Sequence, residues 1–297
     1  MSPRVNDTVL TAGLWLGAGA SGSVVLLIGG FLVWEAWPAF GEIGFAGFVR
    51  DASWHPSEGR FNVVPMVMAS LLAMGGALLL AGPLGLLVAV FCGWYAPRPV
   101  AVVTRRVLEL LAGVPSVVYG FWGLVTLVPL LGRWRPPGAS LLAGTLILAV
   151  MVLPTVALLS EAALRQVPGA QVRGAAALGL RRWAVLWRVV IPGARGGIAT
   201  ASLLAAGRAI GETMAVLMVC GNVVQLPGFD SGGPFAPVRT LTANIALEMG
   251  YAFGAHRSAL FVTGLMLLAV VVGLVGVASR FGSPRPRKWV RQGVAVG

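Results

Sequence analysis

Residues 168–192 read Pro168-Gly-Ala-Gln-Val-Arg-Gly-Ala-Ala-Ala-Leu-Gly-Leu-Arg-Arg-Trp-Ala-Val-Leu-Trp-Arg-Val-Val-Ile-Pro192 and lie between two long apolar runs. This composition predicts two short amphipathic helices that are separated at Gly179, with the arginines facing water. A flexible polar linker would not need such small, helix-forming residues. The residues leave two interpretations open: a helix pair that docks into a cleft on a cytoplasmic partner, or an interfacial helix anchored by arginine.

The composition of the whole chain is that of a membrane protein. Of its 297 residues, 57% are hydrophobic and only 11% are charged, whereas soluble domains carry about 25% charged residues. One helical crossing of a bilayer needs about 20 apolar residues. We therefore predict an all-α integral membrane protein with six transmembrane helices. The corresponding apolar runs lie at about 9–34, 63–95, 108–131, 140–160, 196–221 and 258–280.

The basic residues predict how these helices are oriented. Fifteen of them fall in segments that would share one face of the membrane, and six fall in segments on the opposite face. Because lysine and arginine concentrate in cytoplasmic loops, we expect the first face, with both chain termini, to be cytoplasmic. The larger set is Arg4, Arg98, Arg105, Arg106, Arg165, Arg173, Arg181, Arg182, Arg188, Arg195, Arg280, Arg285, Arg287, Lys288 and Arg291, and the smaller set is Arg50, Arg60, Arg133, Arg135, Arg239 and Arg257.

The apolar runs divide the chain into three parts. Residues 1–62 are expected to form an N-terminal tail, the first transmembrane helix and an outer loop. Residues 63–281 would form a core of five transmembrane helices with a cytoplasmic loop at about 166–192, and residues 282–297 a basic cytoplasmic tail. In the last outer segment, apolar residues at Leu241, Ile245, Ala246 and Met249 predict a short helix that lies in the membrane interface or dips into it.

Several kinds of chemistry are excluded. The only lysine, Lys288, is followed by Trp289, so a phosphate-binding loop ending in Gly-Lys-Ser/Thr cannot exist here, and any ATP-driven work must be done by a partner. The two histidines lie far apart, so local spacing provides no metal site. The net charge of +12 is spread over short segments, which indicates membrane topology and no nucleic acid. We expect neither an enzyme nor a cofactor.

One charged pair falls inside the fifth apolar run, in Gly207-Arg-Ala-Ile-Gly-Glu-Thr-Met-Ala-Val216. Arg208 and Glu212 are four residues apart, which predicts neighbours on one helix face. A charge near the bilayer centre costs about 2.5 to 3.5 kcal/mol for arginine, so both must face protein or water. Arg208 would offer a fixed charge to a passing oxyanion while Glu212 holds the guanidinium. The alternative is an ion pair that only locks helices, which adds little stability.

The loop at 168–192 resembles the coupling loop of ABC importer permeases, with its pattern Glu-Ala-Ala, three residues, Gly, nine residues and Ile-x-Leu-Pro. In that register the matching positions are Arg173, Gly174, Ala175, Gly179 and Pro192. Arg173 and Gly174 depart from the family's Glu and Ala. The literal Glu161-Ala-Ala163 is out of register. The resemblance implies that this loop docks onto the ATPase through its helical shape and Gly179.

The segment from Arg208 to Val216 closely resembles the PstC family, the permeases of phosphate-specific ABC importers. Three further stretches, at 83–91, 113–120 and 237–252, resemble the same family, and the similarity covers nearly all of 54–281. It implies an inner-membrane permease with the type I ABC importer fold that imports phosphate by alternating access, with Arg208 and Glu212 essential. The implied partners are a PstA-like permease in a heterodimer, two copies of a PstB-like ATPase and a PstS-like phosphate-binding protein, and the chain itself would contact membrane lipid.

Two alternatives remain open at this point. A permease for another oxyanion, molybdate or sulfate, would have the same fold, and an ATP-independent channel or carrier belongs to a different class. Ser116 and Tyr119 are further candidates for the substrate pathway, because their hydroxyl groups suit an oxyanion. The competing interpretation is that these hydroxyls bond to their own backbone, as they often do in membrane helices.

Overall fold

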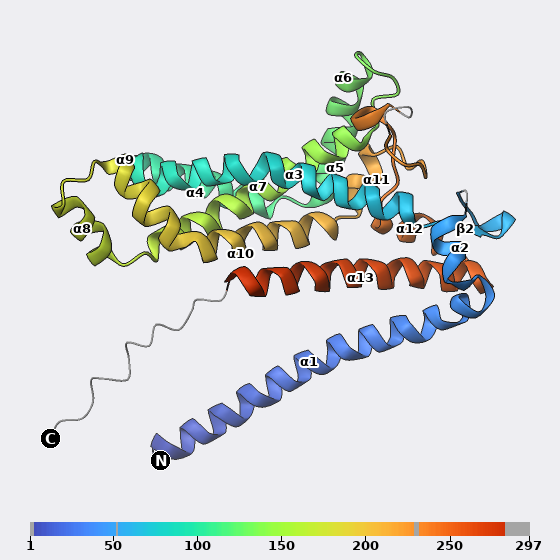
Figure 1. Cartoon of the computed structure of the whole chain (residues 1–297), viewed down its shortest axis with the longest axis horizontal. Helices are drawn as coiled ribbons and strands as arrows, with labels where there is room; N and C mark the ends of the chain where they lie inside the picture. The colour runs from blue at the N-terminus through green and yellow to red at the C-terminus, as the bar shows by residue number, and fades with distance from the viewer. Residues whose placement is uncertain (1–2, 52, 229–231, 283–297) are drawn as a thin grey trace.

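The computed structural model describes residues 3–51, 53–228 and 232–282. Nearly all of the described chain is helical (Figure 1). The elements, in chain order, are α1 (Pro3–Glu42), α2 (Gly44–Arg50), β1 (Trp54–His55), the 3-10 helix η1 (Pro56–Glu58), β2 (Arg60–Phe61), α3 (Val64–Val90), the π-helix η2 (Phe91–Tyr95), α4 (Arg98–Gly113), α5 (Ser116–Trp122), the π-helix η3 (Gly123–Leu127), α6 (Val128–Gly132), α7 (Leu141–Arg165), α8 (Gly169–Ala177), α9 (Arg182–Val185), the π-helix η4 (Leu186–Val190), α10 (Ile191–Ile210), α11 (Met214–Val219), the 3-10 helix η5 (Gly233–Phe235), α12 (Leu241–Glu248) and α13 (Gly254–Gly282).

The long helices form an elongated bundle. Helices α3, α4, α7 and α10 run alongside one another, and α13 lies between this group and α1 (Figure 1). Helices α8 and α9 lie at one end of the bundle, and α2, β2 and α12 lie at the other (Figure 1). The predicted basic tail at 282–297 falls outside the described residues except for its first residue.

Five helices are long and apolar enough to cross a membrane, and the predicted number of six is reached when one bent helix pair is counted as a single span. The bent pair is Arg98–Gly113 and Ser116–Gly132, which meet at 90°. The expected continuous span at 108–131 is therefore wrong in one respect, because the chain turns sharply at Val114 and Pro115. Proline has no N–H to continue the helix and pushes the preceding residue out of the helical region. Val114 is accordingly extended, with φ −65° and ψ 129°.

Small residues let α3 and α7 approach closely. One face of α3 carries an alanine or glycine at every fourth position, and all of them are buried. A Cβ atom added to Gly85 would lie 2.9 Å from Val156 of α7, so the valine occupies the space that glycine leaves. Close backbone approach of this kind is the usual source of helix association in membranes. The residues of the α3 face are Ala69, Ala73, Ala77, Ala81, Gly85 and Ala89.

Helix α12 confirms the short helix expected near 240–249, but its surroundings differ from the prediction. Its first turn, Leu241 to Asn244, is wholly buried, whereas Ala246 is exposed. The helix is packed within the protein, and its buried carboxylate, Glu248, has partners from three other segments. Glu248 pairs with Arg239 and accepts hydrogen bonds from Trp54 Nε1 (2.8 Å), while His256 Nε2 lies 2.8 Å away.

Candidate functional site

Arg208 lies in the last turn of α10 and is half-buried. Its guanidinium reaches two other helices: Nη2 donates to the backbone carbonyl of Ala112 in α4 at 3.3 Å, and Nη1 donates to Oγ1 of Thr155 in α7 at 3.4 Å. Both acceptors are neutral and both contacts are long for hydrogen bonds. Within residues 3–51, 53–228 and 232–282, Arg208 forms no ion pair with a carboxylate. Its positive charge is therefore not neutralised by the described chain.

The carbonyl groups beside Arg208 are available because α4 ends there. The last carbonyls of a helix have no partner within that helix, and they carry the negative end of its dipole. At the turn, the Ala112 carbonyl accepts from Arg208. The Leu111 carbonyl accepts the Tyr119 hydroxyl at 2.8 Å and also the Val114 N–H at 3.3 Å. Arg208 and Tyr119 thus stabilise the same helix end from α10 and α5.

Glu212 does not sit on the helix face of Arg208, and that prediction is wrong. Helix α10 ends at Ile210, two residues before Glu212. Its carboxylate instead accepts the backbone N–H of Ala215 at 3.1 Å, which satisfies one of the free N–H groups in the first turn of α11. The backbone carbonyl of Glu212 accepts the hydroxyl of Thr242 from α12 at 2.8 Å.

Tyr119 and Ser116, the two candidate hydroxyl residues, both follow the turn at Val114 and Pro115 but differ in burial and hydrogen bonding. Tyr119 is buried, and its proton is given to Leu111. Ser116 is the first residue of α5 and half-buried, and its hydroxyl forms no hydrogen bond with the described part of the chain. Thr155 was not found by sequence reasoning. It is one hydroxyl in an apolar run, and the only local signal is the preceding Pro154, which interrupts the hydrogen bonding of α7.

The coupling region, residues 166–192, folds as the predicted helix pair. Helix α8 is followed by Gly179 with φ +78°, a left-handed conformation that glycine adopts without steric cost, and then by α9 and η4. Arg173 and Gly174 are exposed, whereas Ala175 is buried. Pro192 lies in the first turn of α10, where a missing N–H costs nothing.

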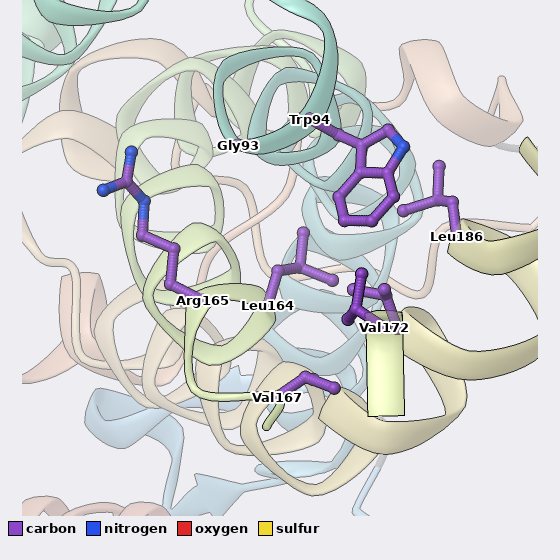
Figure 2. Close-up of a pocket in the computed structure, with 8 residues that line it drawn as sticks. Gly93, Trp94, Leu164, Arg165, Val167, Val172 and Leu186 are labelled. Carbon is purple, nitrogen blue, oxygen red and sulfur yellow. The ribbon is translucent and has the colours of Figure 1, made fainter. Parts of the chain in front are cut away.

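A cavity of about 160 Å³ lies between the coupling region, η2 and the end of α7. Figure 2 shows Trp94, Leu164 and Val172 facing one another across it. Val172 comes from α8, and Ala175 on the same helix belongs to the same apolar cluster. The coupling region is therefore packed onto the bundle through its apolar face and leaves its polar face to water.

Glu161 is confirmed to lie outside the coupling region, near the end of α7. Its buried carboxylate accepts Nε of Arg105 at 2.9 Å and pairs with Arg165 at 2.9 Å. The contact with Arg105 joins α4 to α7 at the end of the bundle that carries α8 and α9. Glu161 is thus a structural residue and not the glutamate of a coupling loop.

A bundle of membrane-crossing helices, a helix pair exposed at one end and an unneutralised guanidinium among the helices define a permease subunit of an ABC importer. The protein family "Binding-protein-dependent transport system inner membrane component" matches residues 81–287 of this chain. The chain belongs to this family and, within it, to the PstC permeases. It is therefore a multi-pass inner-membrane transport subunit without a catalytic role, and its class works with an ATPase and a binding protein.

Curated relatives support the finer placement. The chain is 34% identical to the "Phosphate transport system permease protein PstC" of Mesorhizobium japonicum over 280 residues, which is 86% of this chain and 84% of the relative. It is 39% identical to the "Probable ABC transporter permease protein YqgH" of Bacillus subtilis over 229 residues, 75% of this chain and 73% of the relative.

Solved structures support the fold. A bacterial ABC transporter involved in the import of the acidic polysaccharide alginate matches 96% of this chain and 100% of its own with a TM-score of 0.62. The methionine ABC transporter MetNI, in an inward-facing conformation, matches 74% of this chain and 92% of its own with a TM-score of 0.54. Their sequence identities of 14% and 17% limit the comparison to the fold.

Proposed function

We propose that the chain is the permease subunit that conducts inorganic phosphate through an ATP-driven importer, with Arg208 in the substrate pathway. The observation that carries the proposal is the isolation of this guanidinium from any described carboxylate. A charge among membrane helices costs several kcal/mol unless it is compensated. An anion that enters the pathway supplies the compensation, and the planar donors of arginine suit the oxygens of an oxyanion.

The surroundings of Arg208 favour phosphate over sulfate and molybdate. The carbonyl of Ala112 lies beside the guanidinium, and a carbonyl accepts hydrogen bonds but cannot donate them. Hydrogen phosphate carries a proton to give, whereas sulfate and molybdate at neutral pH carry none. The Ala112 carbonyl already accepts from Arg208, and its second lone pair can accept the proton of hydrogen phosphate but finds no donor on a fully deprotonated anion. The phosphate transport names of the curated relatives support the same choice.

The other predicted pathway residues fit the proposal in different ways. Tyr119 holds the end of α4 in place for Arg208, and the hydroxyl of Ser116 at the start of α5 has no hydrogen-bond partner among the described residues. Glu212 fixes the start of α11 just beyond Arg208. In this proposal Glu212 shapes the wall of the pathway and does not hold the guanidinium directly.

The proposed partners are a PstA-like permease in a heterodimer, two copies of a PstB-like ATPase and a PstS-like binding protein. Arg173, Gly174, Ala175, Gly179 and Pro192 would form the ATPase contact, with both chain termini on the same cytoplasmic side. The division into 1–62, 63–281 and 282–297 belongs to the same proposal. ATP binding drives transport only if it favours one arrangement of the coupling region over the other.

The test is ATP turnover and anion uptake by the complete complex in proteoliposomes. We expect phosphate-loaded binding protein to stimulate ATP hydrolysis, and sulfate and molybdate to compete poorly for uptake. Arg208→Gln should abolish uptake in a complex that assembles normally. Normal uptake by that variant would remove Arg208 from the pathway. Uptake by this chain alone, without the ATPase, would instead indicate a channel or carrier.

A further inference from the structure

Thr155 is the only side chain within the described residues that hydrogen-bonds to the guanidinium of Arg208. It follows Pro154 in α7 and is half-buried. Guanidinium has donors and no acceptor, so in this contact the threonine hydroxyl acts as the acceptor. The hydroxyl still has its own proton to give.

Several other hydroxyl residues of the long helices use that proton within their own helix, whereas Ser160 of α7 has no hydrogen-bond partner within the described chain. Ser70 donates to the Met66 carbonyl at 2.8 Å, Thr200 to the Gly196 carbonyl at 3.0 Å, and Ser202 to the Ile198 carbonyl at 3.1 Å. This is the usual arrangement for serine and threonine in membrane helices. Thr155 makes no such bond with the described chain, although it lies in the middle of a 25-residue helix.

The position of Thr155 determines what its proton can reach. An oxyanion bound to Arg208 lies next to the oxygen that Nη1 already contacts at 3.4 Å. A hydroxyl that accepts from a cation and donates to an anion is polarised by both, and this strengthens each hydrogen bond.

We propose that Thr155 is a ligand of the transported oxyanion, which receives a hydrogen bond from the Thr155 hydroxyl while Arg208 binds its charge. This inference rests on the proposed function. It adds a second helix, α7, to the substrate contacts, so that the anion joins α10 to the helix that also packs against α3. The oxygens of a tetrahedral oxyanion point in different directions. One of them can therefore accept from the Thr155 hydroxyl while others accept from Arg208.

Two pairs of variants test the role of the hydroxyl in the complete importer in proteoliposomes. Thr155→Val keeps the shape of the side chain and removes the oxygen, whereas Thr155→Ser keeps the oxygen. Thr155→Ala and Thr155→Ser differ only in that oxygen. This second pair tests the hydroxyl if Thr155→Val does not assemble. The matched control is Thr200→Val in α10, where the hydroxyl serves only its own helix.

We expect maximal phosphate uptake to fall about tenfold or more in Thr155→Val and Thr155→Ala, the effect of losing one hydrogen bond to a charged group. Thr155→Ser should retain most of the uptake, and Thr200→Val should transport as the unaltered chain does. The inference is overturned if Thr155→Val transports normally, or if Thr155→Ser fails as badly as Thr155→Ala.

Arg208→Gln, measured alongside, separates this inference from the proposed function. If Arg208→Gln abolishes uptake and Thr155→Ala does not change it, Arg208 stays in the pathway and Thr155 is removed from it. If neither variant changes uptake, neither Arg208 nor Thr155 belongs to the substrate pathway, and the proposed function of Arg208 fails as well.

Discussion

Arg182 of α9 donates a hydrogen bond from Nη2 to the backbone carbonyl of Trp94, 2.6 Å away and 88 residues earlier in the chain. The same guanidinium lies 5.7 Å from the ring centroid of Tyr95. Trp94 and Tyr95 end the helix formed by α3 and η2, and carbonyls at such an end have no partner within the helix. Arg182 therefore connects the coupling region directly to the end of a membrane-crossing helix.

Replacing Arg182 should weaken the transmission of movement from the ATPase. We expect Arg182→Ala to lower the amount of phosphate imported per ATP hydrolysed about fivefold, as the loss of about 1 kcal/mol allows. The measurement is uptake and ATP turnover in the same proteoliposomes. Arg188→Ala is the control, because Arg188 is exposed and its side chain forms no hydrogen bond or ion pair with the described chain. An unchanged ratio in Arg182→Ala would show that this connection is not used.

Gly179 and Gly174 form a second matched pair. Gly179→Ala places a Cβ atom on a residue with φ +78°, which costs about 1 to 2 kcal/mol. The turn between α8 and α9 should then distort, and less ATPase should co-purify with the permease. Gly174→Ala lies within α8 and meets nothing within 4 Å, so it should raise helix stability by up to about 1 kcal/mol. Equal ATPase recovery from both variants would contradict the assigned role of Gly179.

The buried carboxylate of Glu161 should be needed for stability. In Glu161→Gln the guanidinium groups of Arg105 and Arg165 lose their counter-charge, with a cost of about 2 kcal/mol because both arginines remain partly exposed. Thermal unfolding of the purified complex should show a lower midpoint. Glu109→Gln, which breaks an exposed pair with Arg106, should leave the midpoint unchanged. If Glu161→Gln and Glu109→Gln unfold at the same temperature, the ion pairs of Glu161 with Arg105 and Arg165 do not stabilise the protein.

The end of the bundle that carries α12 gives a fourth prediction, for Glu248. Its carboxylate joins Trp54, Arg239 and His256 around α12, and α12 holds Glu212 through Thr242. Glu248→Gln should therefore lower the unfolding midpoint and reduce phosphate uptake, because the chain beside Arg208 loses its support. The control is Glu58→Gln, whose pair with Arg60 is exposed. If Glu248→Gln lowers the unfolding midpoint but leaves phosphate uptake normal, α12 does not support the substrate pathway.

The sequence was sufficient for the parts of the fold that depend on local patterns. The candidate crossings follow from apolar length, and the helix pair at 168–192 follows from its small, helix-forming residues and the break at Gly179. Arg208 stood out because a charge in an apolar run is expensive. These inferences need no knowledge of which helices are neighbours.

The remaining features depend on contacts between distant segments. Thr155 and Ala112 lie 53 and 96 residues from Arg208, and no local pattern connects them. The spacing of Arg208 and Glu212 predicted a shared face only on the assumption that the helix continues. It ends at Ile210, where the carboxylate of Glu212 serves the next helix instead.

The fit between Gly85 and Val156 has a consequence for how the protein moves. A branched side chain seated in a glycine gap resists sliding along the helix axis, since any shift drives the methyl groups into backbone. We therefore expect helices α3 and α7 to move as one rigid body during the proposed transport cycle. A pivot would then lie elsewhere, and the right-angled turn at Val114 and Pro115, next to the Ala112 carbonyl that Arg208 contacts, is a place where no continuous helix opposes rotation.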